Sequence, residues 1–476
     1  MIPSFHAPIR ALLVNIPDPA RSGKGYGIPL GLAYVAAALE RAGAAVKVLD
    51  LAQTKTMATW HYMGSTPWAI EEIRAFRPEL AGFTGTTFAR YNFGHWAAAV
   101  KRLAPGCRIA VGGPHVTFEA EATLRAFSEI DACVVGEGEV TARALAEAVA
   151  AGRDFDGIEG LVWRADGEIR KNALRPPLED LDDLPLPARH LFNLAGYDIS
   201  IAEFDRGATV TLMTSRGCVA RCKFCATPGI FPRYRTRSPG HVLAEVERVL
   251  TDYPQVENLL FYDDTMTADE DRLRALVEGF KKASRPFRWA CWSRADVIED
   301  SLLDAMRESG CSVISFGVES GSPRMLKAIG KGVTAEKALA AILTTRAHGI
   351  TPRATFISGL PGETLEDAEM TLEFIRRSGL GRSASISPGG GLRYYPGSRW
   401  TEEFLKNYPG FDWMNPPPGP DYHRDEEGRP LAPIHRFPPK EIRYLREELW
   451  KIWNPAPPLW WRALRAAARK LGVKTP

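Results

Sequence analysis

The chain has 476 residues, of which 45% are apolar and 25% are charged, a composition that excludes disordered, collagen-like and low-complexity proteins and predicts two or three domains of about 150 residues. Its 60 Lys and Arg nearly balance 57 Asp and Glu, for a formal charge of +3, so we expect no general attraction to nucleic acid. No apolar run reaches the ~18 residues of a membrane span, and the N-terminus lacks the apolar core of a secretory signal, so we expect a cytoplasmic protein.

Residues 1–150 alternate short apolar segments with helical ones. Strands are expected at 11–16, 45–50, 80–85, 108–113 and 131–136, with a helix at 29–43. Apolar strands that end in glycine, with helices between them, indicate an open parallel sheet of the Rossmann type. Such sheets bind ligands outside the carboxyl ends of their strands, unless the glycines only make tight turns. The residues expected there include Asn15, Thr84, Thr86, Thr87, Gly112, Gly113, His115, Gly136, Glu137 and Gly138.

A connector is expected at 151–207. It contains a hairpin, because Asp166-Gly167 is a dipeptide that favours a two-residue turn. The Pro- and Asp-rich stretch 176–189 is expected to run over the surface.

A second alternating series follows at 208–400. Six strands are expected, with helical segments between them, at 209–215, 258–264, 287–293, 312–320, 351–359 and 384–388. Six strand–helix units predict a partial (β/α)6 barrel of the TIM type, whose chemistry lies at the carboxyl ends of the strands.

Residues 401–476 are expected to form a small, mostly helical extension. From Arg436 to Pro476 the chain carries ten Lys or Arg against three acids, and four tryptophans. A basic amphipathic helix in this tail would contact a membrane surface, which would make the protein peripherally membrane-associated. The alternative is a helix that packs its Trp face on the barrel.

Three of the seven cysteines, Cys218, Cys222 and Cys225, lie within eight residues in a CxxxCxxC pattern. Their segment is polar and rich in turns, which argues against buried core cysteines. Three thiolates on one loop can hold an iron–sulfur cluster. A structural zinc site needs a fourth Cys or His at close spacing, and the next, His241, lies sixteen residues further on. A four-iron cluster held by three cysteines leaves one iron open to an outside ligand.

This loop, with Phe224 before the third cysteine, resembles the signature of the radical S-adenosylmethionine (SAM) superfamily. The segments TSRGCVARCKFC, FYDDTMTADEDRL, FGVESGSPRMLKAIGKGVT and FISGLPGET also resemble that superfamily. The segments PLGLAYVAAALERAG, VGGPHVT and VVGEGE resemble the cobalamin-binding domain that precedes the barrel in one large subclass. The resemblance covers roughly residues 10–400.

The resemblance implies a [4Fe–4S] cluster on Cys218, Cys222 and Cys225, whose open iron chelates SAM and whose reduction yields a 5′-deoxyadenosyl radical. The residues that it implies for SAM binding are Phe224, Asp263, Asp264, Arg294, Glu319, Ser320, Gly359, Pro361 and Gly362. Asp264 is as well explained as a helix N-cap, whereas a buried Glu319 requires a partner.

The resemblance also implies cobalamin against the N-terminal strand ends given above. Relatives that ligate cobalt through histidine carry Asp-x-His-x-x-Gly, whereas this chain has alanine at position 52, two residues after Asp50. We therefore expect no protein imidazole on the lower cobalt face.

The leading functional hypothesis is methylation of an unactivated carbon in a small-molecule, tetrapyrrole or lipid substrate. Tyr394, Tyr395 and Trp413 are expected to line the substrate pocket, unless they are packed core. A flavodoxin or ferredoxin is the expected one-electron donor. The alternatives are an oxidative cyclase or ring-rearranging enzyme of tetrapyrrole or hopanoid metabolism and an RNA-modifying enzyme. The last is disfavoured because the N-terminal region holds only Cys107 and Cys133, too few for a second cluster.

Overall fold

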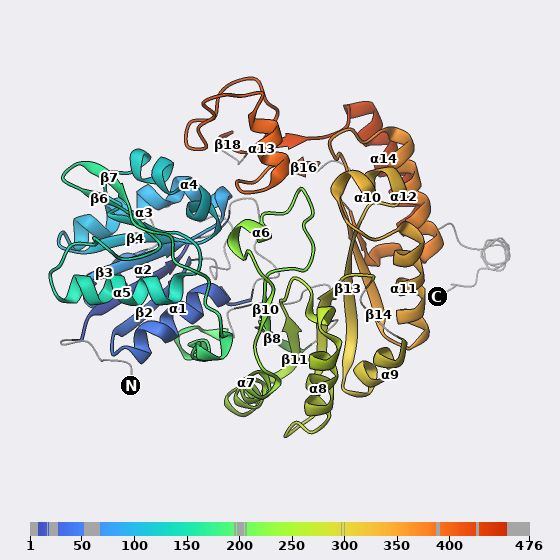
Figure 1. The fold of residues 1–476 in the computed structure, drawn as a ribbon, viewed down its shortest axis with the longest axis horizontal. Coiled ribbons are helices and arrows are strands. Elements are labelled where there is room, and N and C mark those ends of the chain that lie inside the picture. The colour runs from blue at the N-terminus through green and yellow to red at the C-terminus, as the bar shows by residue number, and fades with distance from the viewer. Residues whose placement is uncertain are drawn as a thin grey trace, which may run out of the picture.

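Two largely parallel sheets, with a small third unit beside both, form the computed structural model (Figure 1). The structure describes residues 8–16, 18, 27–51, 67–194, 197, 204, 207–296, 298, 300–386, 391–424 and 428–454. The predicted α/β fold is confirmed. Among the described helices, none is long and apolar enough to cross a membrane.

The N-terminal sheet has seven strands in the order β2-β1-β3-β4-β5-β6-β7, of which β1 to β5 are parallel. Helices α1 and α5 cover one face and α2, α3 and α4 cover the other. The parallel strands are β1 (Arg10–Asn15), β2 (Ala45–Asp50), β3 (Leu80–Thr84), β4 (Arg108–Gly112) and β5 (Ala132–Val134). The helices are α1 (Leu30–Arg41), α2 (Pro67–Phe76), α3 (Arg90–Leu103), α4 (Pro114–Ala126) and α5 (Gly138–Ala150).

The hairpin expected in the connector forms, but it belongs to the N-terminal sheet. β6 (Leu161–Ala165) and β7 (Glu168–Lys171) are joined by Asp166 and Gly167, both with positive φ, as a type I′ turn requires. β6 pairs antiparallel with β5, so the hairpin extends the sheet at that edge. The connector beyond it contains two single turns of 3₁₀ helix, Leu181–Asp183 and Arg189–Leu191.

The second sheet has six parallel strands in the order β15-β14-β13-β12-β11-β8, as the strand–helix series predicted. The strands are β8 (Ala208–Leu212), β11 (Val256–Phe261), β12 (Arg288–Ser293), β13 (Cys311–Glu319), β14 (Thr351–Phe356) and β15 (Ala384–Ser385). The helices are α7 (Pro239–Asp252), α8 (Glu270–Lys281), α9 (Asp300–Glu308), α10 (Pro323–Ile329), α11 (Ala335–Ala347) and α12 (Leu365–Ser378).

Alternate residues of these strands face opposite sides. In β13, Ile314, Phe316 and Val318 belong to the large apolar core under the helices. Ser315, Gly317 and Glu319 therefore lie on the inner face of the open barrel. This parity decides which side chains reach the site.

The C-terminal extension contains α13 (Arg399–Leu405) and α14 (Pro439–Trp453). It also contains a three-stranded antiparallel sheet that the sequence analysis did not predict, because its strands are short and interrupted by prolines. The strands are β16 (Leu392–Arg393), β17 (Tyr422–Arg424) and β18 (Pro430–His435). α14 packs Leu445 and Leu449 on the barrel core. The basic tail with Trp460 and Trp461 lies outside the described residues.

Candidate active site

The three cysteines lie on a loop that leaves the first barrel strand and is closed at its base by a two-residue ribbon. β9 (Ser215–Arg216) pairs antiparallel with β10 (Arg235–Thr236), and the loop between them contains the short helix α6 (Thr227–Ile230). Gly217 has a φ of +86°, and a Cβ there would lie 2.4 Å from the Arg233 carbonyl oxygen. Glycine is therefore required directly before Cys218.

An apolar cluster surrounds part of this cysteine loop. Cys222 packs with Met325 and Ile329 of α10 and with Trp400 of α13, while Phe224 lies 6.5 Å from the Trp400 ring. The backbone of the loop is fixed as well, because the Lys223 N–H donates to the Ile329 carbonyl (2.9 Å) and its carbonyl accepts from Trp400 N–H (3.0 Å). The loop is thus held by the barrel on one side and by the extension on the other.

The cysteine thiols fit an iron–sulfur cluster. None of the three cysteines forms a disulfide. Burial raises the pKa of Cys222, whereas the charge of Lys331 lowers it. Burial lowers the pKa of the nearby Arg294, whereas its contacts with Asp296 and, to a smaller extent, the charges of Cys222 and Cys218 raise it above the ordinary value. In the described part of the chain, no three His, Cys, Asp or Glu side chains converge on a single metal ion. In a four-iron cluster, the three cysteines would bind different iron atoms, so their thiols need not converge on one point. Lys331 and Arg294 lie near the thiols and would offset the negative charge of the thiolates.

Arg294 and Ser358 carry polar atoms that are ready for a ligand. The Arg294 guanidinium is held by Asp296 (2.9 and 2.7 Å) and by the Lys331 carbonyl (3.0 Å). Its Nη1 is nevertheless buried without a partner in the described structure, as is the Ser358 hydroxyl. A buried donor without a partner costs free energy, so the open barrel face suits a ligand with a carboxylate or hydroxyl groups, as SAM has.

Glu319 has the buried partner that its position required. Its carboxylate accepts from the Lys331 ammonium at 3.1 Å, and both side chains are at most 10% exposed. Glu319 also has a φ of +72° and follows a bulge in β13. Such a left-handed conformation in a non-glycine residue is strained and typical of functional sites. The sequence analysis missed Lys331, although a lysine between two glycines after a helix was a visible signal.

The adjacent acids Asp263 and Asp264 play different parts. Asp263 is buried and accepts from both the backbone N–H and the hydroxyl of Thr214, so it fixes the exit of β8. Asp264 is more accessible and accepts from the Thr227 hydroxyl of the cysteine loop (3.4 Å). Burial and the charge of Asp263 raise the pKa of Asp264. Asp264 is the acid of this pair that remains available to a ligand.

Ser320 and one side of the Gly359–Gly362 turn already have protein contacts. Ser320 is buried and hydrogen-bonded to the Thr371 hydroxyl (3.2 Å). A Cβ on Gly359 would meet Arg436 and the His435 carbonyl at 2.9 Å, so the extension occupies that side of the turn. Gly362 has open space around it, and Pro361 lies between the two glycines in the same turn. Glu363 closes the turn by accepting from the Gly359 and Leu360 N–H groups.

The carboxyl edge of the N-terminal sheet is built from small residues. Thr84 and Gly112 are register partners at the ends of β3 and β4, and Gly136 follows β5. Gly113 has a φ of +101°, and a Cβ there would lie 2.8 Å from the Thr84 hydroxyl. Glycine at 113 therefore lets the ends of β3 and β4 pack closely, while a Cβ on Gly112 would meet only Val134 at 3.8 Å and Gly136 has open space beside it. An edge without side chains at Gly112 and Gly136 suits a bulky ligand such as cobalamin, and we call this edge the cobalamin cradle.

Other residues expected at this edge already have partners. Asn15 donates to Asp50 (2.8 Å), and Thr86 donates to Asp18 (2.9 Å). His115 is fully buried with its Nδ1 3.4 Å from the Thr87 hydroxyl, while its Nε2 is without a partner in the described structure. Burial, with the charge of Arg90, lowers the pKa of His115 to about 3, so its ring is neutral.

Glu137 faces the barrel. Its carboxylate pairs with Arg235 and lies 3.3 Å from the Arg216 guanidinium, on the ribbon below the cysteine loop. Glu139 pairs with Arg216 as well. Gly138 lies between the two glutamates and packs near Val35 of α1. Glu137, which we expected at the cobalamin edge, and Glu139 therefore connect the two domains.

The three residues expected to line a substrate pocket pack against other parts of the chain. Trp413 and Tyr395 join Phe88 of the N-terminal domain in one apolar cluster, and Tyr394 stacks on Phe404 with ring centroids 4.4 Å apart. The sequence analysis missed Arg90, which is buried and donates to the Thr87, Trp413 and Pro430 carbonyls. The extension is thus tied to the loop after β3.

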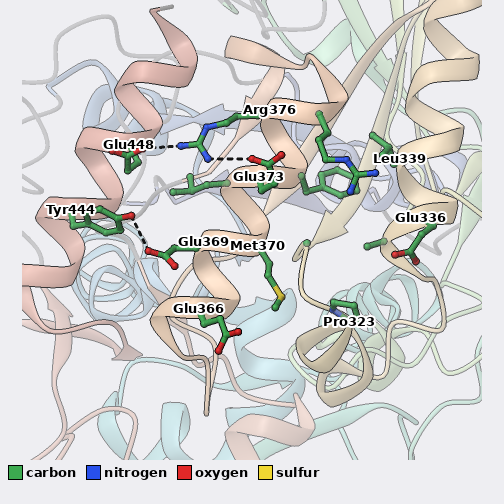
Figure 2. Close-up of a pocket in the computed structure, with 15 residues that line it drawn as sticks. Pro323, Glu336, Leu339, Glu366, Glu369, Met370, Glu373, Arg376, Tyr444 and Glu448 are labelled. Carbon is green, nitrogen blue, oxygen red and sulfur yellow. Dashed lines mark hydrogen bonds and ion pairs between the residues drawn. The ribbon is translucent and has the colours of Figure 1, made fainter.

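A hollow of about 600 Å³ lies on the outer side of the barrel, between α11, α12 and α14. Figure 2 shows its charged wall, where Arg376 reaches Glu373 and Glu448 and the Tyr444 hydroxyl reaches Glu369. None of its lining residues comes from the cysteine loop or the inner barrel face, so it is separate from the candidate site.

Comparison with known proteins agrees with this arrangement. Residues 212–375 match the family model "Radical SAM superfamily" and residues 19–146 match "B12 binding domain". The chain is 33% identical over 385 residues to the "Uncharacterized methyltransferase PH0819" of Pyrococcus horikoshii, covering 80% of this chain and 79% of the relative. It is 30% identical over 354 residues to an "Anaerobic magnesium-protoporphyrin IX monomethyl ester cyclase" of Rubrivivax gelatinosus, covering 73% of this chain and 62% of the relative.

Among solved structures, the radical SAM methyltransferase TsrM of Kitasatospora setae superposes with a TM-score of 0.72 at 19% identity, over 94% of this chain and 89% of TsrM.

Proposed function

Because the chain belongs to the radical SAM enzymes that carry an N-terminal B12-binding domain, we propose that it methylates an unactivated carbon of a small-molecule, tetrapyrrole or lipid substrate. The cofactors are those of the two matched families: SAM, a [4Fe–4S] cluster and cobalamin. The observation that supports the proposal most is the contact between the two carboxyl edges. Glu137 follows β5 and Arg216 follows β8, so their ion pair brings the cobalamin cradle to the cysteine loop.

When bound, the cluster supplies the electron that cleaves SAM to a 5′-deoxyadenosyl radical, and cobalamin carries the methyl group. The protein holds and orients these groups. Cys218, Cys222 and Cys225 are the cluster ligands in this proposal, and the ammonium of Lys331 offsets their charge. The apolar cluster around Cys222 and Phe224 shields that part of the loop from water.

We assign the SAM carboxylate to Arg294, whose buried Nη1 is without a partner in the described structure. A guanidinium presents donors in a fixed plane that matches a carboxylate. Asp264 and Glu319 are the acids that can accept from the amino group or the ribose. Lys331 orients the Glu319 carboxylate through the 3.1 Å contact between them.

The class of reaction also requires a one-electron donor, for which a flavodoxin or ferredoxin is the proposed partner. The substrate is proposed to enter between the two carboxyl edges, beside Tyr262, whose side chain lies on the inner barrel face and is 54% exposed. Tyr395 and Trp413 would shape this space indirectly, since they hold the extension against Phe88.

The proposal is tested by anaerobic reconstitution of the full chain with iron, sulfide and hydroxocobalamin, followed by incubation with SAM labelled in its methyl group. Retained corrin absorbance, formation of 5′-deoxyadenosine and transfer of label to a carbon of an added substrate support it. Corrin that washes away completely, with 5′-deoxyadenosine still formed, would contradict the cobalamin-dependent reaction.

Oxidative cyclisation is a second candidate, favoured by the similarity to the cyclase of Rubrivivax gelatinosus. The two reactions are separated by mass spectrometry, because methylation adds a CH₂ unit to the product whereas cyclisation removes hydrogen. A second-cluster RNA-modifying reaction has no matching feature in the described N-terminal domain, where Cys107 and Cys133 are both buried in the sheet core.

A further inference from the structure

The base of the cysteine loop is fastened to the N-terminal domain by a buried network of four side chains: Glu137, Glu139, Arg216 and Arg235. We call these four the interdomain ion-pair network. Each side chain is at most 9% exposed. The distance from the Arg216 Nη1 to the Glu137 carboxylate is 3.3 Å, and the distance from the Arg235 Nη1 to the same carboxylate is 3.2 Å.

The two arginines occupy the two ends of the loop. Arg216 precedes Gly217 and Cys218, and Arg235 closes the loop as its direct cross-strand partner in the β9–β10 ribbon. Like charges that face each other across paired strands repel, and burial strengthens the repulsion. The ribbon therefore depends on carboxylates from outside the barrel.

The N-terminal domain supplies these carboxylates from one short segment. Glu137 occupies the N-cap position of α5 without a side-chain capping bond, and Glu139 lies in its first turn, directly after β5. The Arg216 guanidinium also lies 5.6 Å from the Tyr34 ring of α1 and 5.8 Å from the Phe231 ring of the loop. It thus contacts both domains at once.

We propose that Glu137 and Glu139 are positioning residues, which act through Arg216 and Arg235 to hold the cysteine loop at a fixed place relative to the cobalamin cradle. This inference rests on the proposed function for its purpose, because methyl transfer needs the two sites at a constant separation. The GEGE segment then serves the geometry between the two sites instead of binding cobalamin directly.

The test is hydrogen exchange of residues 217–234 in the full chain without added cofactors, comparing wild type with the double variant Glu137→Gln/Glu139→Gln. Exchange in the loop is expected to accelerate by roughly tenfold or more, since a buried charge without its partner is strongly destabilising. The matched control is Asp131→Asn, which removes a partly buried carboxylate paired with Lys101 and Arg108 in the N-terminal domain, outside the network. Unchanged loop exchange, or equal acceleration in the control, would overturn the proposal.

Two further measurements test the same proposal independently. If the double variant does not fold, Arg216→Lys keeps the charge but loses the planar fork, and it is expected to accelerate loop exchange in the same direction. In the reconstituted protein, the distance between cob(II)alamin and the reduced cluster, measured by pulsed dipolar EPR, is expected to broaden or shift in the variants but not in the control. A wild type that binds no cobalamin would refute the proposed function, and loop exchange would still decide the role of the network.

Discussion

The two carboxyl edges use opposite means to prepare a site. At the N-terminal edge, Gly112 and Gly136 carry no side chain and leave space, whereas Gly113 lets the end of β4 pack against Thr84, which a Cβ there would meet at 2.8 Å. At the barrel edge, charged side chains and thiols point into the site, and Lys331 and Arg294 lie close to the cysteines. The two edges thus differ in what they offer a ligand: backbone without side chains at the N-terminal edge, and charged side chains and thiols at the barrel edge.

This difference predicts how each edge responds to mutation. The barrel edge should be sensitive to the loss of a side chain, and the N-terminal edge to the gain of one. Positions of the barrel away from its carboxyl edge, such as the outer hollow in Figure 2, should respond weakly to either change.

The largest effect is expected for Cys222→Ala at the barrel edge. Loss of one of three thiolate ligands should abolish iron binding and 5′-deoxyadenosine formation, measured by iron assay and by chromatography of the nucleoside. Cys291→Ala is the matched control, because Cys291 is buried in the barrel core away from the loop. Equal iron content in both variants would contradict the cluster assignment.

Lys331→Met should lower the free energy of unfolding by about 3–5 kcal/mol, because it leaves the buried Glu319 carboxylate without its cation. Urea denaturation measures this change. Lys281→Met removes a lysine that pairs with Glu308 on the surface and should cost far less, because exposed ion pairs contribute little to stability. Similar losses in the two variants would mean that the Glu319–Lys331 pair is not buried as described.

Gly113→Ala tests the N-terminal edge by adding one methyl group. It should cost about 1 kcal/mol or more, because φ is +101°, and should reduce the corrin absorbance retained after desalting. Gly152→Ala separates strain from crowding, since Gly152 also has a positive φ but open space around it. Full corrin retention by Gly113→Ala would show that the cradle does not hold the cofactor.

The turn at Gly359 should make stability depend on pH. Burial raises the pKa of Glu363 to about 7, although hydrogen bonds from Leu360 and Gly359 oppose the shift. Because the pKa of Glu363 is higher in the folded state than in the unfolded state, its protonation favours folding. This contribution to stability is fully present below about pH 4.5 and is lost as the pH rises to about 7. Across this pH window, the free energy of unfolding of the wild type should fall by about 1–2 kcal/mol relative to that of Glu363→Gln, which denaturation at several pH values measures. Parallel curves would contradict the shift.

The smallest effect is expected on the outer face. Arg376→Ala removes a partly exposed ion pair with Glu448 that joins α12 to α14 (Figure 2), and should cost about 0.2–1 kcal/mol without changing cofactor binding. Thermal unfolding and corrin retention measure the two properties. A loss of retained corrin in this variant would mean that a change at the outer hollow alters cofactor binding at the site.

Local sequence signals predicted most of the secondary structure and the centre of the site. Some signals depend only on residues close together in the chain, so they could be recognised in the sequence. Examples are the apolar strand at 45–50, the turn at Asp166-Gly167 and the three cysteines. The small sheet of the extension was not, because β16 and β17 have two and three residues and no alternation. The placement of Glu137 was also missed, because Arg235 lies 98 residues away.

The sequence by itself determined two α/β units, their parallel strands and a loop of three thiols, because periodicity, glycine and cysteine spacing act over a few residues. Only the tertiary structure decided the partners of the buried charges: Glu139 with Arg216, Glu319 with Lys331, and Arg90 with the extension. A buried charge pairs with whichever opposite group the packing brings near, and that choice has no local signature. The separation of the two edges is therefore a property of the folded chain.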